Sequence, residues 1–253
     1  MEEQKPQQIN LLQNNEFMQN ALMTQANEIL DTLLDFKALM LGYSAAIRQI
    51  RTKLEILNTE FEVKYQRNPI SNIQSRLKSQ VSIMEKLNRK GLPVSQESIE
   101  ENIHDIAGVR VICSYVDDIY RLADALVGQD DIELVEKKDY IVNPKPNGYR
   151  SLHLIVRLPV YFAETTRKVT AEIQIRTIAM DFWASLEHQI KYKKKMSNPE
   201  AVAAKLKQCA DVITYTDMMM QNIRKEMDNE HAEETPDLAD QIYEKLKRFD
   251  VSI

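Results

Sequence analysis

Glycine is scarce in this chain, with 5 residues among 253. Neither a G-x-x-x-x-G-K-[ST] run nor a G-x-G-x-x-G run is present, and these are the glycine-rich loops that hold phosphates with backbone amides. If the protein binds phosphates, it must therefore bind them with side chains.

The chain also lacks long apolar runs and a strong charge of either sign. No apolar run approaches the about 20 residues that cross a bilayer, and the first residues, MEEQKPQQIN, lack a charged-then-apolar signal. We therefore expect a cytoplasmic protein without a membrane partner. The net charge of −5 gives no general attraction to nucleic acid, so we expect no DNA partner and only a local basic site. Cys113 and Cys209 lie far apart and are both expected to be reduced thiols of the core.

The first part of the chain has a helical pattern. Residues 1–15 are rich in Gln and Asn and are predicted to be disordered. Apolar side chains then recur at helical spacing over 16–66, where Gly42 is a candidate break between two helices. A further helix is predicted over Ser71–Lys90, capped by its first residue and ended by the glycine that follows it.

The middle of the chain is rich in β-branched residues. The stretch AGVRVICSYV is typical of a buried strand, and further strands are predicted over 132–138, 149–158 and 169–177. Helices are predicted over 95–102, 117–127, 179–192, 199–227 and 238–249. This order indicates an α+β fold, in which helices flank a mixed sheet and extend from both ends of the chain.

Polar side chains alternate with apolar ones in VTAEIQIRT. Because successive residues of a strand point to opposite faces, Glu172, Gln174 and Arg176 share one face. An antiparallel strand with a solvated outer face explains this pattern equally well. A carboxylate, an amide and a guanidinium in a row also make a set of groups that can recognise a ligand.

The stretch NPKPNGYRSLHLIVRLP, residues 143–159, shows the same alternation. Tyr149, Ser151 and His153 lie on one face, and leucines lie on the other. An aromatic ring, hydrogen-bond donors and a carboxylate on two strands suit a nucleotide. Arg150 points with the leucines by parity, so we predict that it makes a buried or interface pairing rather than a substrate contact.

Two carboxylates and a basic segment complete the candidate site. Asp105 alone is most simply a cap or turn residue, but paired with Glu172 across a sheet it could hold Mg²⁺, which prefers one or two carboxylates plus substrate phosphates. The segment Ser71–Lys90 supplies cations, and these are Arg76, Lys78, Lys86, Arg89 and Lys90. A solvated helix face also explains such a run of cations.

Three stretches together resemble the synthetase domain of RelA/SpoT homologues, and more closely that of the small alarmone synthetases: DIAGVRVICSYVDDIY, KDYIVNPKPNGYRSLHLIV and VTAEIQIRTIAMDFWASLEHQIKYK. The likeness covers roughly residues 68–195. It implies a nucleotidyltransferase-like mixed sheet of about five strands. It also implies an N-terminal helical extension over 1–67, a synthetase domain over 68–195, and C-terminal helices over 196–253.

The resemblance implies an activity as well. A (p)ppGpp synthetase, or GTP pyrophosphokinase, transfers the β,γ-pyrophosphate of ATP to the 3′-oxygen of GDP or GTP, releases AMP, and acts in the stringent response. His104-Asp105 lies inside the synthetase motif and no other His-Asp hydrolase segment is present, so we expect synthesis without hydrolysis. Family likeness, together with surplus apolar helices, predicts a homotetramer.

The roles known in the family fall on matching residues of the donor side. By this resemblance, Asp105 and Glu172 bind Mg²⁺, and Glu172 also helps to deprotonate the acceptor hydroxyl. Arg76 and Arg110 would sandwich adenine with their planar guanidinium groups. The residues expected to hold the ATP phosphates are Lys78, Lys86 and Arg89.

On the acceptor side, the resemblance places Tyr149 against the guanine ring. Asp181 is expected to select guanine, because a carboxylate can accept from both its N1 and N2 donors. Lys145 would contact the phosphates of GDP or GTP. His153 and Gln174 would position the ribose or a phosphate.

Two other functions fit parts of the pattern. A catalytically silent nucleotide-binding or RNA-binding regulator could share the fold, although it would not need both Asp105 and Glu172. A helical oligomeriser would leave the polar strand faces unexplained. Among the remaining motif residues, His188 fits a site role and a structural role equally, whereas Trp183 is predicted to lie in the core.

Overall fold

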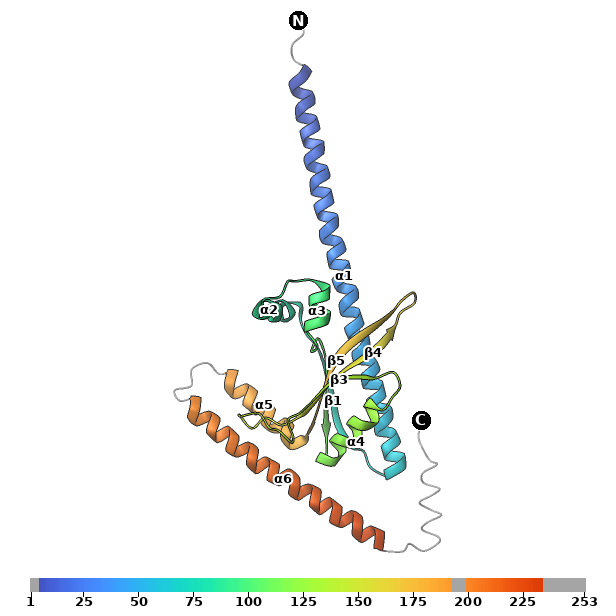
Figure 1. Ribbon diagram of the computed structural model, residues 1–253, viewed down its shortest axis with the longest axis vertical. Coiled ribbons are helices and arrows are strands. Elements are labelled where there is room, and N and C mark those ends of the chain that lie inside the picture. The colour runs from blue at the N-terminus through green and yellow to red at the C-terminus, as the bar shows by residue number, and fades with distance from the viewer. Residues whose placement is uncertain (1–4, 193–198, 234–253) are drawn as a thin grey trace.

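The computed structural model describes residues 5–192 and 199–233, with six helices and five strands (Figure 1). The helices are α1 (Lys5–Tyr65), α2 (Gln80–Lys90), α3 (Gln96–Asn102), α4 (Val116–Val127), α5 (Ile178–Tyr192) and α6 (Pro199–Glu233). The strands are β1 (Ile70–Leu77), β2 (Ala107–Cys113), β3 (Glu133–Asp139), β4 (Leu152–Tyr161) and β5 (Thr166–Thr177).

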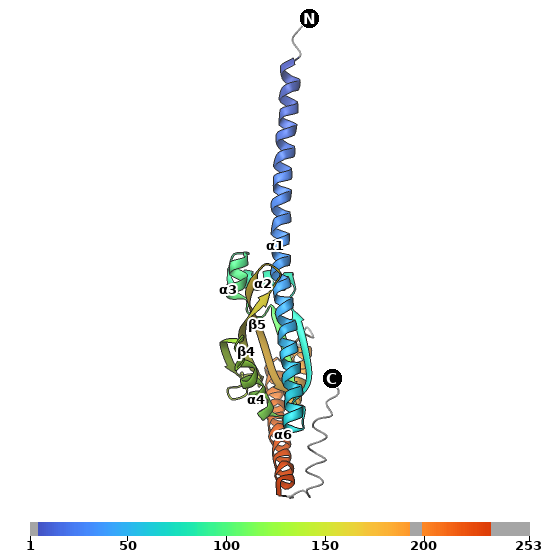
Figure 2. The same cartoon turned by 90° about the vertical axis from the view of Figure 1, so that its right-hand side faces the viewer.

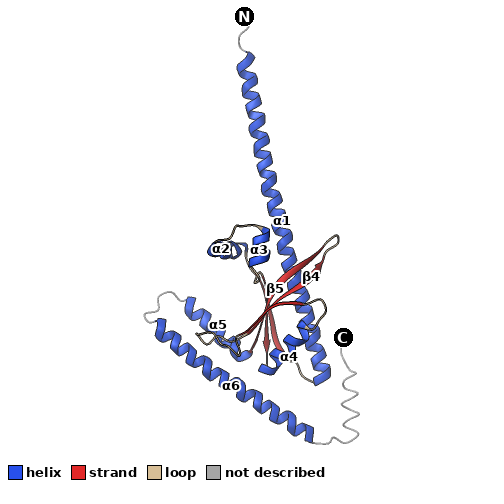
Figure 3. Ribbon diagram, in the orientation of Figure 1, coloured by secondary structure: helices blue, strands red, loops and turns tan. Residues whose placement is uncertain are grey.

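The five strands form one mixed sheet in the order β1-β2-β5-β4-β3. β2 and β5 are parallel neighbours, and the other neighbouring pairs are antiparallel. Helices surround the sheet and carry both ends of the described chain (Figure 3). The α+β class, the mixed five-stranded sheet and the helical extensions predicted from the sequence are confirmed.

α1 is one continuous helix of 61 residues. It begins at Lys5, so the disorder predicted for residues 1–15 is wrong from that residue onward. Helix elongation costs less than nucleation, so a polar Gln/Asn-rich segment can continue a helix that is anchored elsewhere. The predicted break at Gly42 is also wrong: a Cβ there would make an ordinary contact of 3.5 Å with Val169 of β5, so this glycine lies where the helix meets the sheet.

The C-terminal half of α1 belongs to the main hydrophobic core. Its buried side chains are Leu39, Tyr43, Ala46, Ile47, Ile50, Leu54 and Leu57. With α4, they pack against the apolar face of the sheet, where Val109, Val111 and Ile173 are buried. In the view turned by 90°, α1 runs along the sheet and its N-terminal part projects beyond the rest of the fold (Figure 2). One face of the sheet is therefore covered.

The helix predicted over Ser71–Lys90 is wrong in its first half, which forms β1. Ile70 and Ile73 are three residues apart, a spacing that indicates a helix. A β-bulge between Ile70 and Asn72 adds one residue, so both isoleucines pair with alternate residues of β2 and share a face. The helix begins only after Ser79, whose hydroxyl accepts a hydrogen bond from the backbone N–H of Ser82, and it ends at Gly91 as predicted.

The C-terminal part of the chain differs from the prediction in two details. α6 continues to Glu233, beyond the end predicted at residue 227, and the helix predicted over 238–249 lies outside the described residues. Cys113 is buried as expected, but Cys209 is exposed on α6, so it is not a core thiol. Among the described residues, no helix is long and apolar enough to cross a membrane.

Candidate active site

The register of the sheet places polar residues from four strands in one row. Gln74 of β1 lies opposite Arg110 of β2, Arg110 lies beside Gln174 of β5, and Gln174 lies opposite His153 of β4. Residues that pair across neighbouring strands share a face of the sheet. The alternation read from the sequence therefore converges on one polar face, opposite the face that α1 covers.

The next row on this face contains the first carboxylate. Arg76 of β1 lies opposite Gly108 of β2, and Gly108 lies beside Glu172 of β5. Arg76 and Arg110 are two register positions apart on neighbouring strands, so both guanidinium groups start from the polar face. Arg76 is exposed there, as is Arg89 near the end of α2.

A chain of hydrogen bonds runs across the face through Glu172. The Tyr149 hydroxyl lies 2.8 Å from Nε2 of His153, and Nδ1 of His153 lies 3.0 Å from Oε1 of Glu172. Gln174 donates to the other carboxylate oxygen at 3.0 Å, and Arg176 donates to the Gln174 amide oxygen at 2.8 Å. An ionised carboxylate only accepts, so the proton of a neutral His153 lies on Nδ1, and Nε2 accepts from Tyr149.

These contacts keep Glu172 ionised. Burial by itself raises the pKa of this carboxyl, but the hydrogen bonds from His153 and Gln174 outweigh burial, and the net pKa is lowered from its usual value. Glu172 is thus a fixed, charged carboxylate on the polar face, with both oxygens held in place.

The row continues at the start of α5. Asp181, in the first turn of this helix, pairs with Arg176 at 3.4 Å and with Arg110 at 3.7 Å. Arg110 also donates to Gln74 at 3.5 Å. Arg110, predicted to contact adenine, and Asp181, predicted to contact guanine, therefore lie side by side in this structure.

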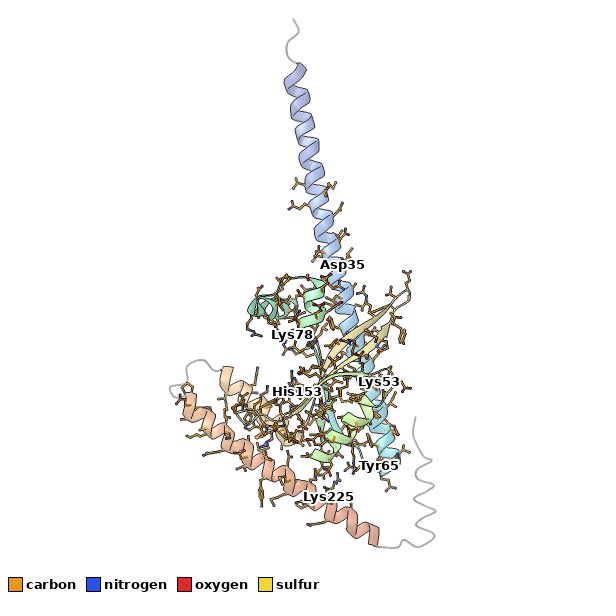
Figure 4. The ribbon with its side chains drawn as sticks, in the orientation of Figure 1. Asp35, Lys53, Tyr65, Lys78, His153 and Lys225 are labelled. Atoms are coloured by element: carbon orange, nitrogen blue, oxygen red, sulfur yellow. The ribbon has the colours of Figure 1, made fainter. Side chains whose placement is uncertain are left out.

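The second carboxylate, Asp105, lies in the turn between α3 and β2. Each of its oxygens is 2.8 Å from a lysine ammonium group, Oδ2 from Lys78 and Oδ1 from Lys86. The backbone N–H of Lys78 donates to the Ile106 carbonyl at 2.9 Å, which brings the residue after β1 next to this turn. Burial raises the pKa of Asp105, but the two lysines outweigh burial, and the net pKa is lowered. Lys78 and His153 lie on the side of the sheet away from α1 (Figure 4).

The two carboxylates have the chemistry of a magnesium site. The charge of Asp105 raises the pKa of Glu172, although less than burial does. The described residues contain no cluster of three or more His, Cys, Asp or Glu side chains that could hold a metal by themselves. Mg²⁺ typically takes one or two protein carboxylates and completes its octahedron with substrate phosphates and water, so two ionised carboxylates near enough for the charge of Asp105 to raise the pKa of Glu172 fit this ion.

Aromatic rings gather at the other end of the polar face. The Lys145 ammonium lies 4.5 Å from the centre of the Tyr140 ring and 4.9 Å from the centre of the Tyr149 ring. Tyr140 and Tyr149 both meet the His153 imidazole edge to face. The Arg176 guanidinium lies 5.7 Å from the Tyr149 ring. This end of the site is a cationic and aromatic cluster suited to a base and its phosphates.

The sequence gives Tyr140 no role, and it indicates Arg176 only as part of a set of groups on one strand face that could recognise a ligand. Arg176 was placed on the polar face by its alternation, and its contacts with Gln174, Asp181 and Tyr149 show that it belongs to the cluster. Tyr140 lies in the stretch KDYIV, just before the loop NPKPNGY that carries Lys145 and Tyr149. An aromatic residue so close to that loop is the one sequence feature that could have indicated a role in the site. Its position depends on the fold of that loop, which no periodicity predicts.

Three motif residues outside the cluster can now be placed. Arg150 pairs with Asp211 of α6 at 3.7 Å, so a pairing is present as predicted, but only the Arg150 side of it is largely buried and the Asp211 side chain is mostly exposed. Trp183 is buried as predicted, and its Nε1 donates to the Leu206 carbonyl at 2.8 Å. His188 is exposed on α5.

Hollows of about 560 Å³ and about 390 Å³ lie along α1 and between α1 and α4. Neither contains Asp105 or Glu172 in its lining. The chemistry of the polar face, rather than the size of a hollow, therefore marks the candidate active site.

Residues 75–197 match the family model described as the region found in RelA/SpoT proteins. The chain is 45% identical over 206 residues to GTP pyrophosphokinase YwaC of Bacillus subtilis, an alignment that covers 81% of this chain and 98% of that protein. The chain belongs to the RelA/SpoT family. It is also 36% identical over 193 residues to GTP pyrophosphokinase YjbM of the same organism, covering 76% of this chain and 90% of that protein.

Solved structures place it in the small alarmone synthetase branch of this family. The crystal structure of small alarmone synthetase 2 from Bacillus subtilis matches with a TM-score of 0.69 and 47% identity, covering 76% of this chain and 99% of that one. Small alarmone synthetase 1 from Bacillus subtilis, bound to its product pppGpp, matches with a TM-score of 0.69 and 36% identity, covering 76% of this chain and 97% of that one. The resemblance drawn from the three motifs is confirmed.

Proposed function

We propose that this protein is a (p)ppGpp synthetase of the stringent response, a GTP pyrophosphokinase without hydrolase activity. One observation carries the proposal: an ionised Glu172 lies on a polar sheet face between the Asp105–lysine cluster and the Tyr149–His153 cluster. The 45% identity to a GTP pyrophosphokinase over nearly the whole of that relative supports it. A silent binding module would have no use for two carboxylates held in the charged state.

In the proposed reaction, the 3′-oxygen of GDP or GTP attacks the β-phosphorus of ATP. A new bond forms between this oxygen and the β-phosphorus, the bond from the β-phosphorus to the oxygen that bridges the α- and β-phosphates breaks, and AMP leaves with that bridging oxygen. The proton of the 3′-hydroxyl passes to Glu172. Proton transfer to a positioned carboxylate contributes about 10²- to 10⁴-fold to such a step.

The donor half of the site is the cluster around Asp105. Lys78 and Lys86 bind the ATP phosphates, and Arg89 adds a third cation from the end of α2. Several donors to one polyanion bind more strongly than neutral hydrogen bonds do. Arg76 and Arg110 start from the same face of neighbouring strands and stack on adenine with their planar guanidinium groups.

The acceptor half is the aromatic cluster. The Tyr149 ring stacks on guanine and Lys145 binds the phosphates of GDP or GTP. His153 and Gln174 orient Glu172 and the acceptor ribose, since both are hydrogen-bonded to that carboxylate. Asp181 accepts hydrogen bonds from the guanine edge, which adenine cannot offer in the same pattern.

Asp105 and Glu172 would hold Mg²⁺. When bound, this ion offsets the charge that the phosphates develop during transfer. The two lysines on Asp105 already supply part of that positive charge. Lys78 and Lys86 would therefore share with the ion the task of neutralising the ATP phosphates.

We also propose that four copies assemble through the terminal helices in the cytoplasm. The support is the set of exposed apolar side chains on these helices, which on α1 are Leu22, Met23, Leu30, Leu33 and Leu34, and on α6 are Val212, Tyr215, Met219, Ile223 and Met227. Apolar surface of this kind is unusual on a monomer. Light scattering coupled to gel filtration should give four chain masses, and one chain mass would contradict the assembly.

The activity is tested with purified protein, ATP, GDP and Mg²⁺, with the nucleotides separated by anion exchange. AMP and ppGpp are expected in equal amounts, and omission of Mg²⁺ should abolish both. ADP alone, or no product from either GDP or GTP, would contradict the proposal. A second incubation with ppGpp alone should return no pyrophosphate, because hydrolysis is not expected.

A further inference from the structure

The loop between β3 and β4 carries two acceptor residues, Lys145 and Tyr149. A tight turn closes it: the N–H of Gly148 donates to the Lys145 carbonyl at 2.8 Å, and the N–H of Lys145 donates to the Tyr149 carbonyl at 3.2 Å. The turn fixes the two residues relative to each other. The contacts that hold the turn relative to Glu172 come from the neighbouring helices α5 and α6.

α6 touches the backbone of this turn. Gly148 is buried and has φ +91, a left-handed conformation that favours glycine. A Cβ at this position would lie 2.6 Å from the Cβ of Ala210 and 3.4 Å from the Cα of Lys207. The loop backbone and the helix are therefore in close contact, with a small residue on each side.

Polar contacts flank this close approach on both sides. The Asn147 side-chain amide donates to Glu187 of α5 at 3.1 Å. Arg150 pairs with Asp211 of α6 at 3.7 Å, and the Arg150 side chain is only 17% exposed. The bond from Trp183 to the Leu206 carbonyl joins α5 to α6 at the same level. α5 and α6 thus form a clamp around residues 147–150.

Within the clamp, α6 contacts the loop that carries Lys145 and Tyr149, whereas α5 also reaches Arg110 through Asp181. Lys78 lies just before α2, Lys86 lies within α2 and Asp105 follows α3, and both lysines pair with Asp105. Farther along, α6 contacts the end of β5 through Asp217 and the start of α4 through Gln221. A shift of α6 at Ala210 would therefore displace Tyr149 and Lys145 before it reached the lysine cluster.

We propose that Ala210 and Asp211 of α6 are positioning residues for the acceptor nucleotide. They act through Gly148 and Arg150, and they hold the Tyr149 ring and the Lys145 ammonium in register with Glu172. This inference rests on the proposed function, which makes Tyr149 and Lys145 acceptor residues. It adds a C-terminal helix outside the sheet to the set of elements that determine acceptor affinity.

The first test is Ala210→Leu, which places three more carbons against Gly148. Displacement of a binding group by about 1 Å can cost up to about 10²-fold, so the acceptor KM is expected to rise by about tenfold or more while the ATP KM changes less than about twofold. The matched control is Ala204→Leu, the same substitution at an exposed position of α6, which should leave both constants unchanged. Equal effects on both substrates, or the same effect from the control, would overturn the proposal.

A second variant avoids the risk that a larger residue simply disturbs folding. Asp211 is 58% exposed, so Asp211→Arg should fold, but it places like charges at the Arg150 pairing. A smaller rise in acceptor KM, about threefold, is expected because partly exposed pairs are screened, and again the ATP KM should not follow. Unchanged acceptor KM in both variants would contradict the clamp.

Hydrogen exchange separates failure of the clamp from failure of the proposed activity. In Ala210→Leu, amides of residues 143–151 should exchange faster, the Lys145 and Gly148 amides included, while those of α2 keep the wild-type rate. Ala204→Leu should match wild type throughout. If the wild-type protein forms no ppGpp, the proposed function fails, yet this comparison still decides whether α6 holds the loop. Unchanged exchange of the loop amides in Ala210→Leu would contradict the clamp.

Discussion

The proposed donor and acceptor halves of the polar face are built in different ways. Around Asp105, the ammonium groups of two lysines, each on a flexible side chain, neutralise a single carboxylate. Around Tyr149, aromatic rings and an uninterrupted chain of hydrogen bonds lead through His153 to Glu172. The donor half relies on charge, and the acceptor half relies on fixed geometry.

This difference suits the two proposed substrates. The phosphate chain of ATP is a polyanion that several mobile cations can follow, because electrostatic attraction depends weakly on direction. The acceptor nucleotide must present one hydroxyl to one carboxylate. If its guanine were misplaced, that hydroxyl would move out of reach and the rate of transfer would fall. Substitutions in the acceptor half should therefore affect geometry and chemistry, whereas those in the donor half should affect ATP binding.

Glu172→Gln should have the largest effect, because it removes the proposed base where the two halves meet. Gln has the same shape and can keep hydrogen bonds to its neighbours, so folding should persist. We expect kcat to fall by about 10³-fold, within the range for general base catalysis, with little change in either KM. Full activity in this variant, measured by ppGpp formation, would contradict the proposed role of Glu172.

Tyr149→Ala should break the acceptor half selectively. Loss of ring stacking is worth about 1–3 kcal/mol per base, so the acceptor KM should rise by about tenfold or more. The control Tyr149→Phe keeps the ring but loses the hydroxyl that lies 2.8 Å from His153. It should retain the acceptor KM and lower kcat a few-fold, because a neutral hydrogen bond contributes about 1 kcal/mol. A parallel rise in the KM for ATP in Tyr149→Ala would argue against stacking on guanine.

Lys86→Met should weaken the donor half alone. The variant keeps most of the apolar stem but removes the ammonium group that lies 2.8 Å from Asp105. The ATP KM is expected to rise by about tenfold, since a charge-assisted contact is worth about 1.5–3 kcal/mol, and the acceptor KM should stay near wild type. Lys90→Met, on the same helix but bonded to the Asn102 carbonyl, is the matched control and should change neither constant. If the control reproduces the effect, general electrostatic attraction rather than a specific contact is responsible.

Asp217→Asn should have the smallest effect, and it concerns stability rather than catalysis. Burial raises the pKa of the Asp217 carboxyl, which accepts a hydrogen bond from Thr177 at the end of β5. A raised pKa in the folded state means that wild type loses stability as the pH rises through that value. Asn resembles the protonated acid, so the variant should match wild type at acidic pH and melt about 2 °C higher at neutral pH. A Tm difference that does not change with pH would show that Asp217 titrates normally.

Much of the polar face was predictable from the sequence, because strand alternation is local. The two-residue alternation of strand side chains is enough to assign Glu172, Gln174 and His153 to this face, and their mutual hydrogen bonds follow from the register. Buried strands and helix caps can likewise be predicted from short stretches of residues. The resemblance added the reaction, which no periodicity could provide.

What the sequence did not predict depends on contacts between distant segments or on one inserted residue. The β-bulge after Ile70 gave a strand the spacing of a helix. Tyr140 joins the site only because the loop between β3 and β4 folds so that its ring lies against Lys145 and His153. The close approach of Gly148 to Ala210 joins this loop to α6, which no local pattern indicates. The length of α1 follows from its anchoring in the core, which composition does not reveal.

The central claim is that the donor and acceptor halves meet at one bond, between the acceptor 3′-oxygen and the β-phosphorus of ATP. The most direct test uses ATP carrying ¹⁸O in the bridge between its α- and β-phosphates, with GDP as acceptor, and mass spectrometry of the products. Attack at the β-phosphorus leaves the label in AMP and none in ppGpp. Label in free pyrophosphate, together with an adenylylated acceptor, would show attack at the α-phosphorus and contradict this account.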